Sequence, residues 1–518
     1  MNGVIRGLRG VVAILAAAVL ASCGGDGGSA VPTGVLAQSC SPNNPYRADA
    51  TAATTTGDLT TEKIWLRDYI DRSYLWYDKV PAVSPGDAIY SNDTLAGFYD
   101  SINTYFLDLT QPLTNPPGKP VDRFSFTYPT AAWDALINGG STVGYGFELQ
   151  FGSETPPRNI RVTYVHAGSQ ADGAGVRRGD TLVLADNVSA DDNTPAGVAA
   201  LNAAIFPVSG SQHSFRFSRA GSAVADYTFV AGTVALKPVQ SQILDVNGSR
   251  VGYLLFNDHV VPAEADLIAA FSSFRAAPGI SDLVLDLRYN GGGYLYIASE
   301  VAFMIAGATR TNNKVFERIM FNNKRSNEDD SGGFLSTACV PNAAFQCTRN
   351  DNLPALSLTR VYVLVSGSTC SASEAIINSL RGVDVDVRLI GSTTCGKPYG
   401  FFGQDNCGIS YFPIEFQGVN AKGFGDYADG FMPANGGGAG YPLPGCAAND
   451  DLGHALGDPA EGQLAAALSY RASGNTACLP LMMAPRQSPL AAGQAALSQG
   501  RVVKPAALTN RNGRMPAR

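Results

Sequence analysis

The stretch Leu-Val-Leu-Asp-Leu-Arg-Tyr-Asn-Gly-Gly-Gly, residues 283–293, decides the fold of this chain of 518 amino acids. Residues 283–287 form an apolar run, interrupted by one aspartate, of the kind found in strands that are buried on both faces of a sheet. The three glycines that follow allow the backbone to approach another group closely. We therefore predict a buried strand that ends in a loop suited to close backbone contact.

A second apolar run has the same design. Val-Tyr-Val-Leu-Val at 361–365 is followed by Ser-Gly-Ser-Thr-Cys-Ser-Ala-Ser-Glu at 366–374, which leads into an apolar helical segment. Another strand is predicted at 251–256, and residues 263–274 have helical periodicity. Because apolar strands that alternate with helices form covered sheets, residues 235–480 are predicted to be an α/β core with a mostly parallel sheet.

The turn at 366–374 suits nucleophilic chemistry. A strand-to-helix turn projects a side chain at the edge of the sheet and leaves unpaired N–H donors at the start of the helix. Such donors can stabilise the oxyanion that forms when a serine attacks a carbonyl group. The glycine-rich loop at 291–293 can bring a further N–H group to the same point.

Residues 139–234 have a different texture, with short alternating segments and glycine-rich turns that are typical of a small β-rich module. Gly144-Tyr145-Gly146-Phe147 resembles the loop with which PDZ domains bind a peptide's terminal carboxylate, and residues 174–182 resemble the helix-turn-strand of bacterial PDZ modules. Several N–H donors on such a loop can converge on one anion, while an extended peptide adds to a strand edge. The alternative is a generic glycine-rich hairpin.

The first residues resemble the signal of bacterial lipoproteins. Arg6 and Arg9 precede the apolar run 11–20, which is too short to span a bilayer, and Leu-Ala-Ser-Cys follows at 20–23. The resemblance implies that Cys23 is lipidated and that the protein is anchored to the bacterial cell envelope, facing the periplasm or the cell exterior. The alternative is an ordinary cleaved signal in which Cys23 has no role.

These patterns divide the chain into six predicted segments. The segment after residue 23 is rich in small and polar residues, the next has helical spacing, and the last has no clear pattern. In order, the segments are a lipoprotein signal peptide (1–23), a flexible tether (24–60), a small N-terminal helical subdomain (61–138), the PDZ-like module (139–234), the catalytic α/β core (235–480) and a C-terminal tail (481–518).

The composition limits which classes of partner and cofactor are expected. The net charge of −7 gives no basis for a nucleic-acid partner. The four histidines are scattered and no Cys-x-x-Cys occurs, so no metal site is expected. Eight cysteines remain beyond Cys23, an even number that is compatible with disulfides in an oxidising compartment.

Taken together, the core motifs resemble the C-terminal processing peptidases, also called tail-specific proteases. That family combines an Asp-Leu-Arg-x-Asn-x-Gly-Gly loop, a Ser-Ala-Ser-Glu turn and a later Gly-Lys, and all three occur here in that order. The resemblance extends over roughly residues 140–470 and includes the PDZ-like module. It implies a ClpP/crotonase-like core and a serine endopeptidase that needs no metal or organic cofactor.

The family's motifs assign roles residue by residue. Ser371 matches the nucleophile, and Lys397 matches the general base. Ala372 matches one backbone donor of the oxyanion hole, and either Gly292 or Gly293 would supply the other. A lysine base must be desolvated to lose its proton near neutral pH. Ser–Lys pairs need no acidic partner.

Two features depart from the family pattern. The spacing between Ser371 and Lys397 is one residue longer than usual, and the extra residue is assigned to the turn at 383–386. Phe401 stands where the family has a glutamine that steadies the lysine, and Gln404 is the nearest replacement. The dyad either uses Gln404 as a third member or works without one.

Cysteines lie beside both catalytic motifs. One hypothesis is that Cys370 and Cys395 form a disulfide that joins the two loops; the alternative is two small buried thiols. Cys339 and Cys347 are predicted to form a local loop bridge. A catalytic Cys370 is a further alternative, but no histidine lies near it in the sequence to activate it.

Two other side chains have competing interpretations. Ser373 is interpreted as the N-cap of the helix, a role that Ser371 would otherwise fill. His259 follows an apolar strand and offers a Ser–His alternative to Lys397, because some relatives of the family use histidine. A histidine at a strand end is more often a satisfied surface residue.

We predict a serine endopeptidase that recognises C-terminal or unstructured segments of proteins through the PDZ-like module and cleaves them through an acyl-enzyme on Ser371. One alternative is a catalytically silent peptide-binding lipoprotein on the same scaffold, since a fold does not guarantee activity. Another is an esterase or other acyl hydrolase. The expected partners are protein or peptide substrates, together with the membrane through the lipid on Cys23.

Overall fold

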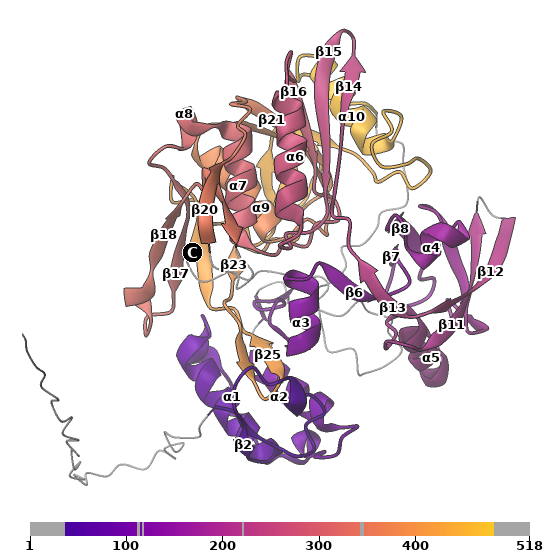
Figure 1. Cartoon of the computed structure of the whole chain (residues 1–518), viewed down its shortest axis with the longest axis vertical. Coiled ribbons are helices and arrows are strands. Elements are labelled where there is room, and N and C mark those ends of the chain that lie inside the picture. The colour runs from indigo at the N-terminus through magenta and orange to yellow at the C-terminus, as the bar shows by residue number, and fades with distance from the viewer. Residues whose placement is uncertain (1–36, 111–113, 116–118, 220–221, 342–346, 481–518) are drawn as a thin grey trace, which may run out of the picture. The chain divides into compact units, whose positions relative to one another are not determined.

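The computed structural model describes residues 37–110, 114–115, 119–219, 222–341 and 347–480 (Figure 1). It is a mixed α/β structure with several sheets. The predicted signal peptide with Cys23 and the predicted tail at 481–518 lie outside the described residues. Among the helices that are described, none is both long and apolar enough to cross a bilayer.

A six-stranded sheet forms the centre of the core. In spatial order its strands are β14 (Val239–Val246), β15 (Ser249–Phe256), β16 (Asp282–Asp286), β21 (Arg360–Val365), β22 (Asp386–Gly391) and β29 (Gly445–Ala447). Only the pairing of β14 with β15 is antiparallel; the other four neighbouring pairs are parallel. β16 is buried over its whole length, as expected for the apolar run that begins at Leu283.

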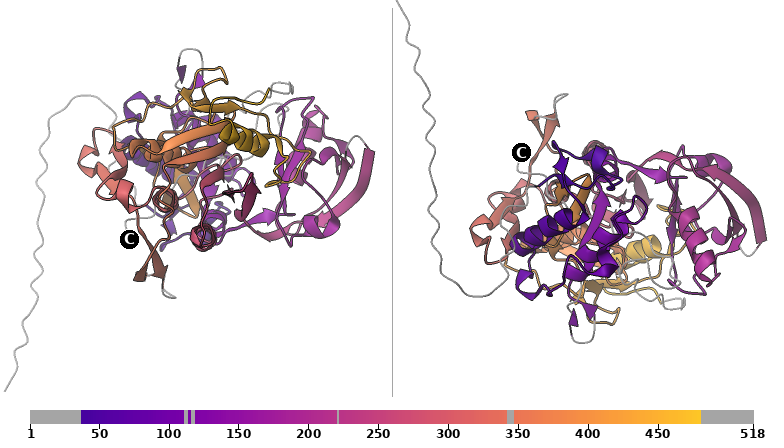
Figure 2. Two further views of the ribbon diagram at one scale, coloured as in Figure 1. Left: turned by 90° about the horizontal axis from the view of Figure 1, so that it is seen from above. Right: turned by 90° about the horizontal axis from the view of Figure 1, so that it is seen from below.

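Helices cover both faces of this sheet. They are α6 (Ala263–Arg275), α7 (Leu295–Ala306), α8 (Ala308–Thr311), α9 (Ala372–Gly382) and α10 (Gly462–Ala472). α10 packs Leu464 and Ala467 against one face, where Val284 and Tyr362 are buried. α6, α7 and α9 stand together on the other face (Figures 1 and 2).

Three adjacent parallel strands deliver three loops to one edge of the sheet. β16, β21 and β22 are neighbours, so the loops that follow them meet at the carboxyl ends of the strands. The N–H of Cys370 donates to the carbonyl of Asn290 (3.0 Å), and the N–H of Cys395 donates to the carbonyl of Thr369 (3.0 Å). Segments that are distant in sequence are therefore joined at this edge.

The N-terminal part is helical and packs on a hairpin of the core. Its helices are α1 (Leu59–Ser73), α2 (Phe98–Thr110) and α3 (Thr130–Ile137), with short 3-10 helices η1 (Arg47–Asp49), η2 (Tyr77–Lys79) and η3 (Ala88–Tyr90). α1 begins after Asp58, whose side chain accepts the N–H of Thr61 (2.6 Å) as an N-cap. β5 (Phe126–Pro129) extends the hairpin of β24 (Gln404–Asn406) and β25 (Ile409–Phe412).

The tether prediction is wrong for residues 37–58. Cys40 forms a disulfide with Cys407 across a sequence separation of 367, and the N–H of Gln38 donates to the side chain of Asn406 (2.7 Å). β1 (Ser39–Cys40) also pairs with β2 (Thr55–Thr56). The composition of this segment gave no sign of order because the residues that fix it are distant in the sequence.

Residues 141–235 form a separate β-rich module around their own apolar core. Its sheet has the order β12-β11-β9-β8-β7, so β7 is an edge strand. The elements are β6 (Ser141–Gly144), β7 (Phe147–Gln150), β8 (Arg161–Val165), α4 (Gln170–Ala174), β9 (Thr181–Ala185), β10 (Val188–Ser189), α5 (Pro195–Ile205), β11 (Gln212–Arg219), β12 (Ser222–Val230) and β13 (Gly232–Ala235).

Smaller sheets complete the structure. They comprise β17 (Val315–Phe321), β18 (Asp330–Gly333), β23 (Tyr399–Gly400) and β26 (Phe416–Val419), with η4 (Ser326–Glu328), and the pairs β3 (Thr114–Asn115) with β4 (Lys119–Pro120), β19 (Thr337–Pro341) with β20 (Cys347–Asn352), and β27 (Phe431–Pro433) with β28 (Tyr441–Leu443). The side chains of Cys339 and Cys347 lie outside the described part, so their bridge stays a prediction.

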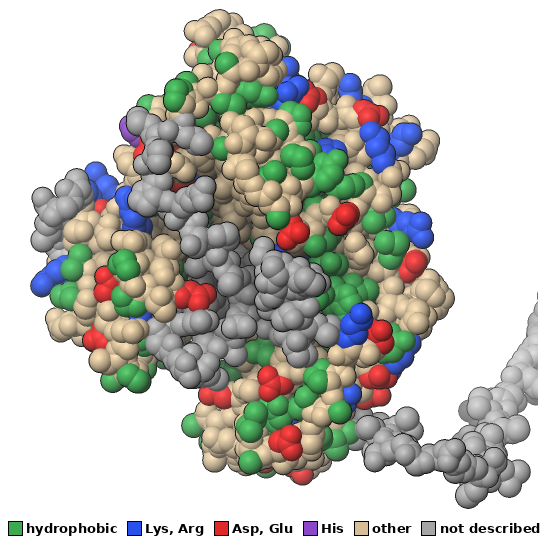
Figure 3. Space-filling view, turned by 180° about the vertical axis from the view of Figure 1, so that it is seen from behind, with side chains coloured by type: hydrophobic (Ala, Val, Ile, Leu, Met, Phe, Trp, Pro, Cys, Tyr) green, Lys and Arg blue, Asp and Glu red, His purple; other side chains and the backbone are tan. Residues whose placement is uncertain are grey.

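Charged side chains are dispersed over the surface. On the face shown in Figure 3, Lys and Arg side chains lie among Asp and Glu side chains. The described part of that face shows no continuous basic area, in keeping with a net charge of −7.

Arg288 lies at the centre of a buried ion-pair cluster. Its side chain is 0% exposed and contacts Asp286 (2.9 Å), Glu461 (2.6 Å) and Asp450 (3.0 Å). Glu461 is also the N-cap of α10, since its side chain accepts the N–H of Leu464. The arginine of the Asp-Leu-Arg motif therefore fastens β16 to the helix on one face of the sheet.

Arg288→Met should lower the free energy of unfolding by roughly 3–5 kcal/mol, because it leaves buried carboxylates without their cation. Lys422→Met is the matched control in the same core: Lys422 and its partner Asp384 have side chains that are 54% and 81% exposed. Its loss should cost less than about 1 kcal/mol. Urea denaturation measures both values, and equal losses would contradict the structural role of Arg288.

Candidate active site

Ser371 occupies a strained turn between β21 and α9. Its φ is 68°, a left-handed conformation that is uncommon for residues other than glycine and that clusters at active sites. The residue is 1% exposed, and its hydroxyl has no hydrogen-bond partner among the described residues. The hydroxyl is therefore held in place by its backbone and is available for chemistry.

Ser373 does not cap the helix. Its hydroxyl donates to the carbonyl of Asn290 (3.1 Å), and Ser371 stands at the N-cap position of α9. The interpretation of Ser373 as the N-cap is therefore wrong. The bond to Asn290 instead ties the start of α9 to the glycine-rich loop after β16.

Lys397 lies in an apolar site at the end of the loop after β22. It is 1% exposed, and its Nζ has no hydrogen-bond partner in the described part of the chain. Two aromatic rings surround it, with centroids 5.3 Å (Phe124) and 4.9 Å (Phe401) from Nζ. Burial lowers the pKa of Lys397 from 10.5 to about 7. A substantial fraction of this side chain is therefore an unprotonated amine at neutral pH.

Glu374 joins the loop of Ser371 to the loop of Lys397. Its buried carboxylate accepts the N–H of Ser371 (2.9 Å), the N–H of Gly396 (2.9 Å) and the N–H of Lys397 (2.8 Å). The hydroxyl of Thr394 donates to the same carboxylate (2.5 Å). Burial raises the pKa of Glu374, although these donors favour the ionised form. The sequence analysis gave Glu374 no role, yet a glutamate three residues after a helix-capping serine is a recognised signal.

The N-terminal subdomain contributes a wall of the site. Arg123 donates to the carbonyls of Cys395 (2.7 Å) and Ala428 (3.2 Å), and Phe124 covers Lys397. The preceding Asp122 is fully buried and accepts the N–H of Phe124 (2.8 Å), which fixes this segment. Sequence reasoning missed these residues, because no local pattern marks a segment that reaches a distant site.

The structure distinguishes the two glycines proposed for the oxyanion hole. The N–H of Gly292 already donates to the side chain of Asn290 (3.0 Å). Gly293 lies opposite His259 in a parallel bridge. The two hydrogen bonds of this bridge are made by the carbonyl of Gly292 and the N–H of Tyr294, so the N–H of Gly293 is directed away from His259. A Cβ on Gly293, whose φ is 136°, would lie 2.5 Å from the carbonyl oxygen of His259, so only glycine fits. Gly293 is thus the better candidate donor, alongside Ala372 at the start of α9.

His259 supports the glycine-rich loop and is not paired with the serine. Its Nδ1 lies 3.0 Å from the side-chain oxygen of Asn290, and burial lowers its pKa to about 3. Neither Nε2 of His259 nor Nζ of Lys397 is hydrogen-bonded to the hydroxyl of Ser371 in the described chain, so hydrogen bonding does not choose between them. A pKa of about 3 makes His259 a weak base, which disfavours the Ser–His alternative. His259 is 0% exposed, so its interpretation as a surface residue is wrong.

The structure does not bring Gln404 to Lys397. Gln404 is exposed on β24, and its side-chain N–H donates to the carbonyl of Asp405 (3.3 Å). Phe401 fills the position beside the ammonium and is 0% exposed. A ring cannot accept a hydrogen bond as an amide does, so the site steadies Lys397 by apolar packing instead.

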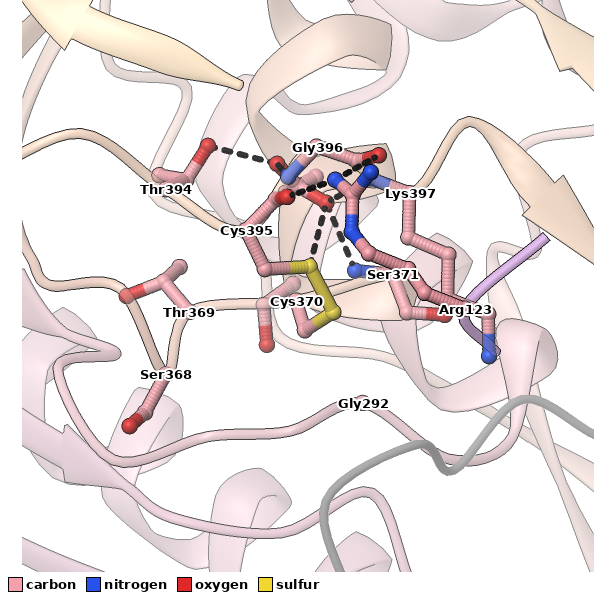
Figure 4. Close-up of a disulfide and its surroundings, with 12 residues drawn as sticks. Arg123, Gly292, Ser368, Thr369, Cys370, Ser371, Thr394, Cys395, Gly396 and Lys397 are labelled. Carbon is pink, nitrogen blue, oxygen red and sulfur yellow. Dashed lines mark hydrogen bonds between the residues drawn. A yellow bond between two sulfur atoms is a disulfide. The ribbon is translucent and has the colours of Figure 1, made fainter. Parts of the chain in front are cut away.

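The predicted disulfide between Cys370 and Cys395 is present, with a Cα–Cα distance of 5.2 Å. Figure 4 shows it beside Ser371 and Lys397, with Arg123 over the same loop. A third disulfide joins Cys446 to Cys478. Among described residues, the two groups close enough to hold a metal ion are Cys40–Glu62–Cys407 and Cys370–Glu374–Cys395, and their sulfurs are bound in disulfides.

The four residues of the predicted carboxylate loop lie together between β6 and β7. Gly144, Tyr145, Gly146 and Phe147 line a cavity of about 340 Å³. The cavity is also lined by side chains at the end of α5 and by Gly291 of the loop after β16. The predicted carboxylate loop and the candidate oxyanion loop therefore line the same cavity.

Lys397→Met should make the folded protein more stable while removing the candidate base. The folded pKa of Lys397 is lowered from 10.5 to about 7, so the unfolded chain binds the extra proton between these values. The wild type consequently gains stability as pH rises from about 7 towards 10.5. The advantage of the variant should be largest at pH 7 and should shrink by pH 9.5, as measured by chemical denaturation at both pH values. A constant difference would contradict the burial of a titrating amine.

Comparison with known proteins places the core among peptidases. Residues 250–400 match the family model described as Peptidase family S41. A carboxyl-terminal-processing protease from Picosynechococcus sp. is 26% identical over 263 residues, which are 51% of this chain and 56% of that protein. The chain thus spans little more than half the length of the curated relative that it matches.

A solved structure shows the same fold. A candidate S41 protease from Bacteroides fragilis NCTC 9343 has a TM-score of 0.58 at 23% identity, over 80% of this chain and 98% of that chain. The photosystem II D1 C-terminal processing protease has a TM-score of 0.42 at 20% identity, over 73% of this chain and 92% of that chain. Residues 250–400 of this chain are therefore a peptidase S41 domain, and the chain is a homologue of carboxyl-terminal processing proteases.

Proposed function

We propose that this protein is a serine endopeptidase that cleaves protein substrates through an acyl-enzyme on Ser371, with Lys397 as general base. One observation carries the proposal. Lys397 is buried without a hydrogen-bond partner in the described chain, its pKa is about 7, and the carboxylate of Glu374 ties its loop to that of Ser371. A lysine in this state can accept a proton at neutral pH.

The proposed reaction follows from this arrangement. The amine of Lys397 takes the hydroxyl proton of Ser371 while Oγ attacks the carbonyl carbon of the scissile peptide bond. The backbone N–H groups of Ala372 and Gly293 donate hydrogen bonds to the oxyanion. The ammonium then gives its proton to the leaving amine. Water hydrolyses the ester in the second half, with Lys397 again accepting the proton and returning it to Ser371.

The silent peptide-binding alternative is not favoured by the S41 match. The absence of the usual glutamine was its main support, and apolar packing by Phe401 and Phe124 offers another way to fix the lysine. An esterase would use the same nucleophile, and a small-ester assay beside the peptidase assay separates the two activities.

We propose that residues 139–234 bind substrate as a PDZ domain does. β7 is an edge strand, so an extended peptide can pair with it. The loop Gly144-Tyr145-Gly146-Phe147 stands at its start and lines the cavity that reaches Gly291. This placement supports recognition of a C-terminal carboxylate next to the site of cleavage.

We further propose that the protein is exported and anchored at the bacterial cell envelope through Cys23. Three disulfides in the described chain support an oxidising compartment. Mass spectrometry of the membrane fraction, searching for a lipid-modified Cys23, tests the anchor.

Wild-type protein should degrade an unfolded protein such as reduced casein, with kcat/KM rising through about pH 7 as Lys397 loses its proton. Ser371→Ala and Lys397→Ala should each reduce the rate at least about 1,000-fold, because neither half of the dyad works alone. Cleavage that survives Ser371→Ala would refute the assignment of the nucleophile. Absence of cleavage by the wild type would revive the silent alternative.

A peptide substrate with a free C-terminal carboxylate should have a KM about 10- to 100-fold lower than the same peptide ending in an amide, since charged hydrogen bonds to the loop are lost in the amide. Gly146→Val should abolish this preference. At φ 102° a Cβ would lie 2.1 Å from the side chain of Ser169. Gly173→Ala, with open space around the added carbon, is the control and should keep it. Equal KM values for acid and amide would contradict carboxylate recognition.

A further inference from the structure

A covalent bond joins the two loops that carry the candidate dyad. Cys370 directly precedes Ser371, and Cys395 lies two residues before Lys397. The disulfide between them spans 25 positions of sequence, which include α9 and β22. Figure 4 shows it beside the residues of the candidate dyad.

Hydrogen bonds also link these loops in the described chain. The N–H of Cys395 donates to the carbonyl of Thr369, and the N–H groups of Ser371 and Lys397 donate to the carboxylate of Glu374. Lys397 has no polar partner in the described structure to hold its Nζ. Its side chain is held by packing against Phe124 and Phe401, and the disulfide constrains the backbone that carries it.

We infer that Cys370 and Cys395 are positioning residues, whose disulfide keeps the amine of Lys397 in register with the hydroxyl of Ser371, so that activity requires the oxidised form. This inference rests on the proposed peptidase function. It goes beyond it, because it makes the rate depend on a thiol reaction that the Ser–Lys chemistry does not itself use.

Reduction would change the site in a definite way. A dithiol reductant transfers two electrons and two protons to the disulfide, which leaves a thiol on Cys370 and on Cys395 and closes the reductant into its own disulfide. Cys395 is partly exposed, whereas Cys370 is 3% exposed, so Cys395 is the sulfur that a reductant reaches first. The Sγ of Cys395 lies 3.4 Å from Oε2 of Glu374. A new thiol there can donate to the oxygen that now accepts the N–H groups of Ser371 and Lys397.

The first test compares two disulfide deletions. Cys370→Ala/Cys395→Ala should lower kcat by about 10- to 100-fold with little change in KM, since small displacements of catalytic groups have effects of this size. Cys446→Ala/Cys478→Ala removes a disulfide of similar span, with a sequence separation of 32, away from the dyad. It should keep kcat within about twofold. Both variants are assayed below the melting temperature of the less stable one.

The second test uses the reductant on the wild type. Dithiothreitol should lower kcat to the value of Cys370→Ala/Cys395→Ala, and reoxidation should restore it. The double variant itself should be insensitive. A chelator is included, because Cys370, Cys395 and Glu374 offer ligand atoms within 4.8 Å of one another and free thiols there could capture a metal ion.

A third measurement does not depend on peptidase activity. Hydrogen exchange should accelerate at the amides of Ser371, Gly396 and Lys397 in the Cys370→Ala/Cys395→Ala variant, and not in the control pair. If the oxidised wild type cleaves nothing, the proposed function fails. Hydrogen exchange then tests by itself whether the disulfide fixes the two loops. If exchange at these amides is unchanged, or if an active enzyme keeps its kcat without the disulfide, the inference is overturned.

Discussion

The carboxylate of Glu374 is the constraint on which the candidate site depends. It is buried, and burial of a charge is unfavourable unless hydrogen bonds replace the lost water. Here backbone N–H groups from two loops, together with the hydroxyl of Thr394, take the place of that water. These loops can satisfy the carboxylate only when they lie together. The need to solvate this carboxylate therefore holds the backbones of Ser371 and Lys397 close together.

The same site leaves its lysine without such compensation. Lys397 is surrounded by Phe124 and Phe401, so its charged form is disfavoured and its pKa falls. Burial therefore acts differently on the two groups. The carboxylate of Glu374 has hydrogen bonds that replace water and hold the loops together. The amine of Lys397 has none in the described chain, so its pKa is lowered.

Much of the core could be predicted from sequence because its signals are local. The apolar runs that begin at Leu283 and Val361 form buried strands, and the helix expected at 263–274 is α6. The serine turn and the cysteine pair also followed from short motifs. The wall formed by Arg123 and Phe124 could not be foreseen, since long-range packing leaves no periodic trace. For the same reason residues 37–58 had the composition of a tether and proved to be fixed by Cys40. Gln404 was chosen by nearness in sequence, but it lies three residues beyond Phe401 at the start of β24, where its side chain is exposed.

The path of the chain into and out of the β-rich module has an evolutionary consequence. The chain enters the module through β6 and leaves it through β13, and these two strands pair with each other. Just outside them, the N–H of Leu236 donates to the carbonyl of Gly140 (2.8 Å). The part of the molecule outside the module is therefore encoded in two pieces, before and after it, which meet at this hydrogen bond. A domain whose ends are adjacent can be exchanged as a cassette without altering the path of its host. The β-rich module and its host can thus change independently of each other.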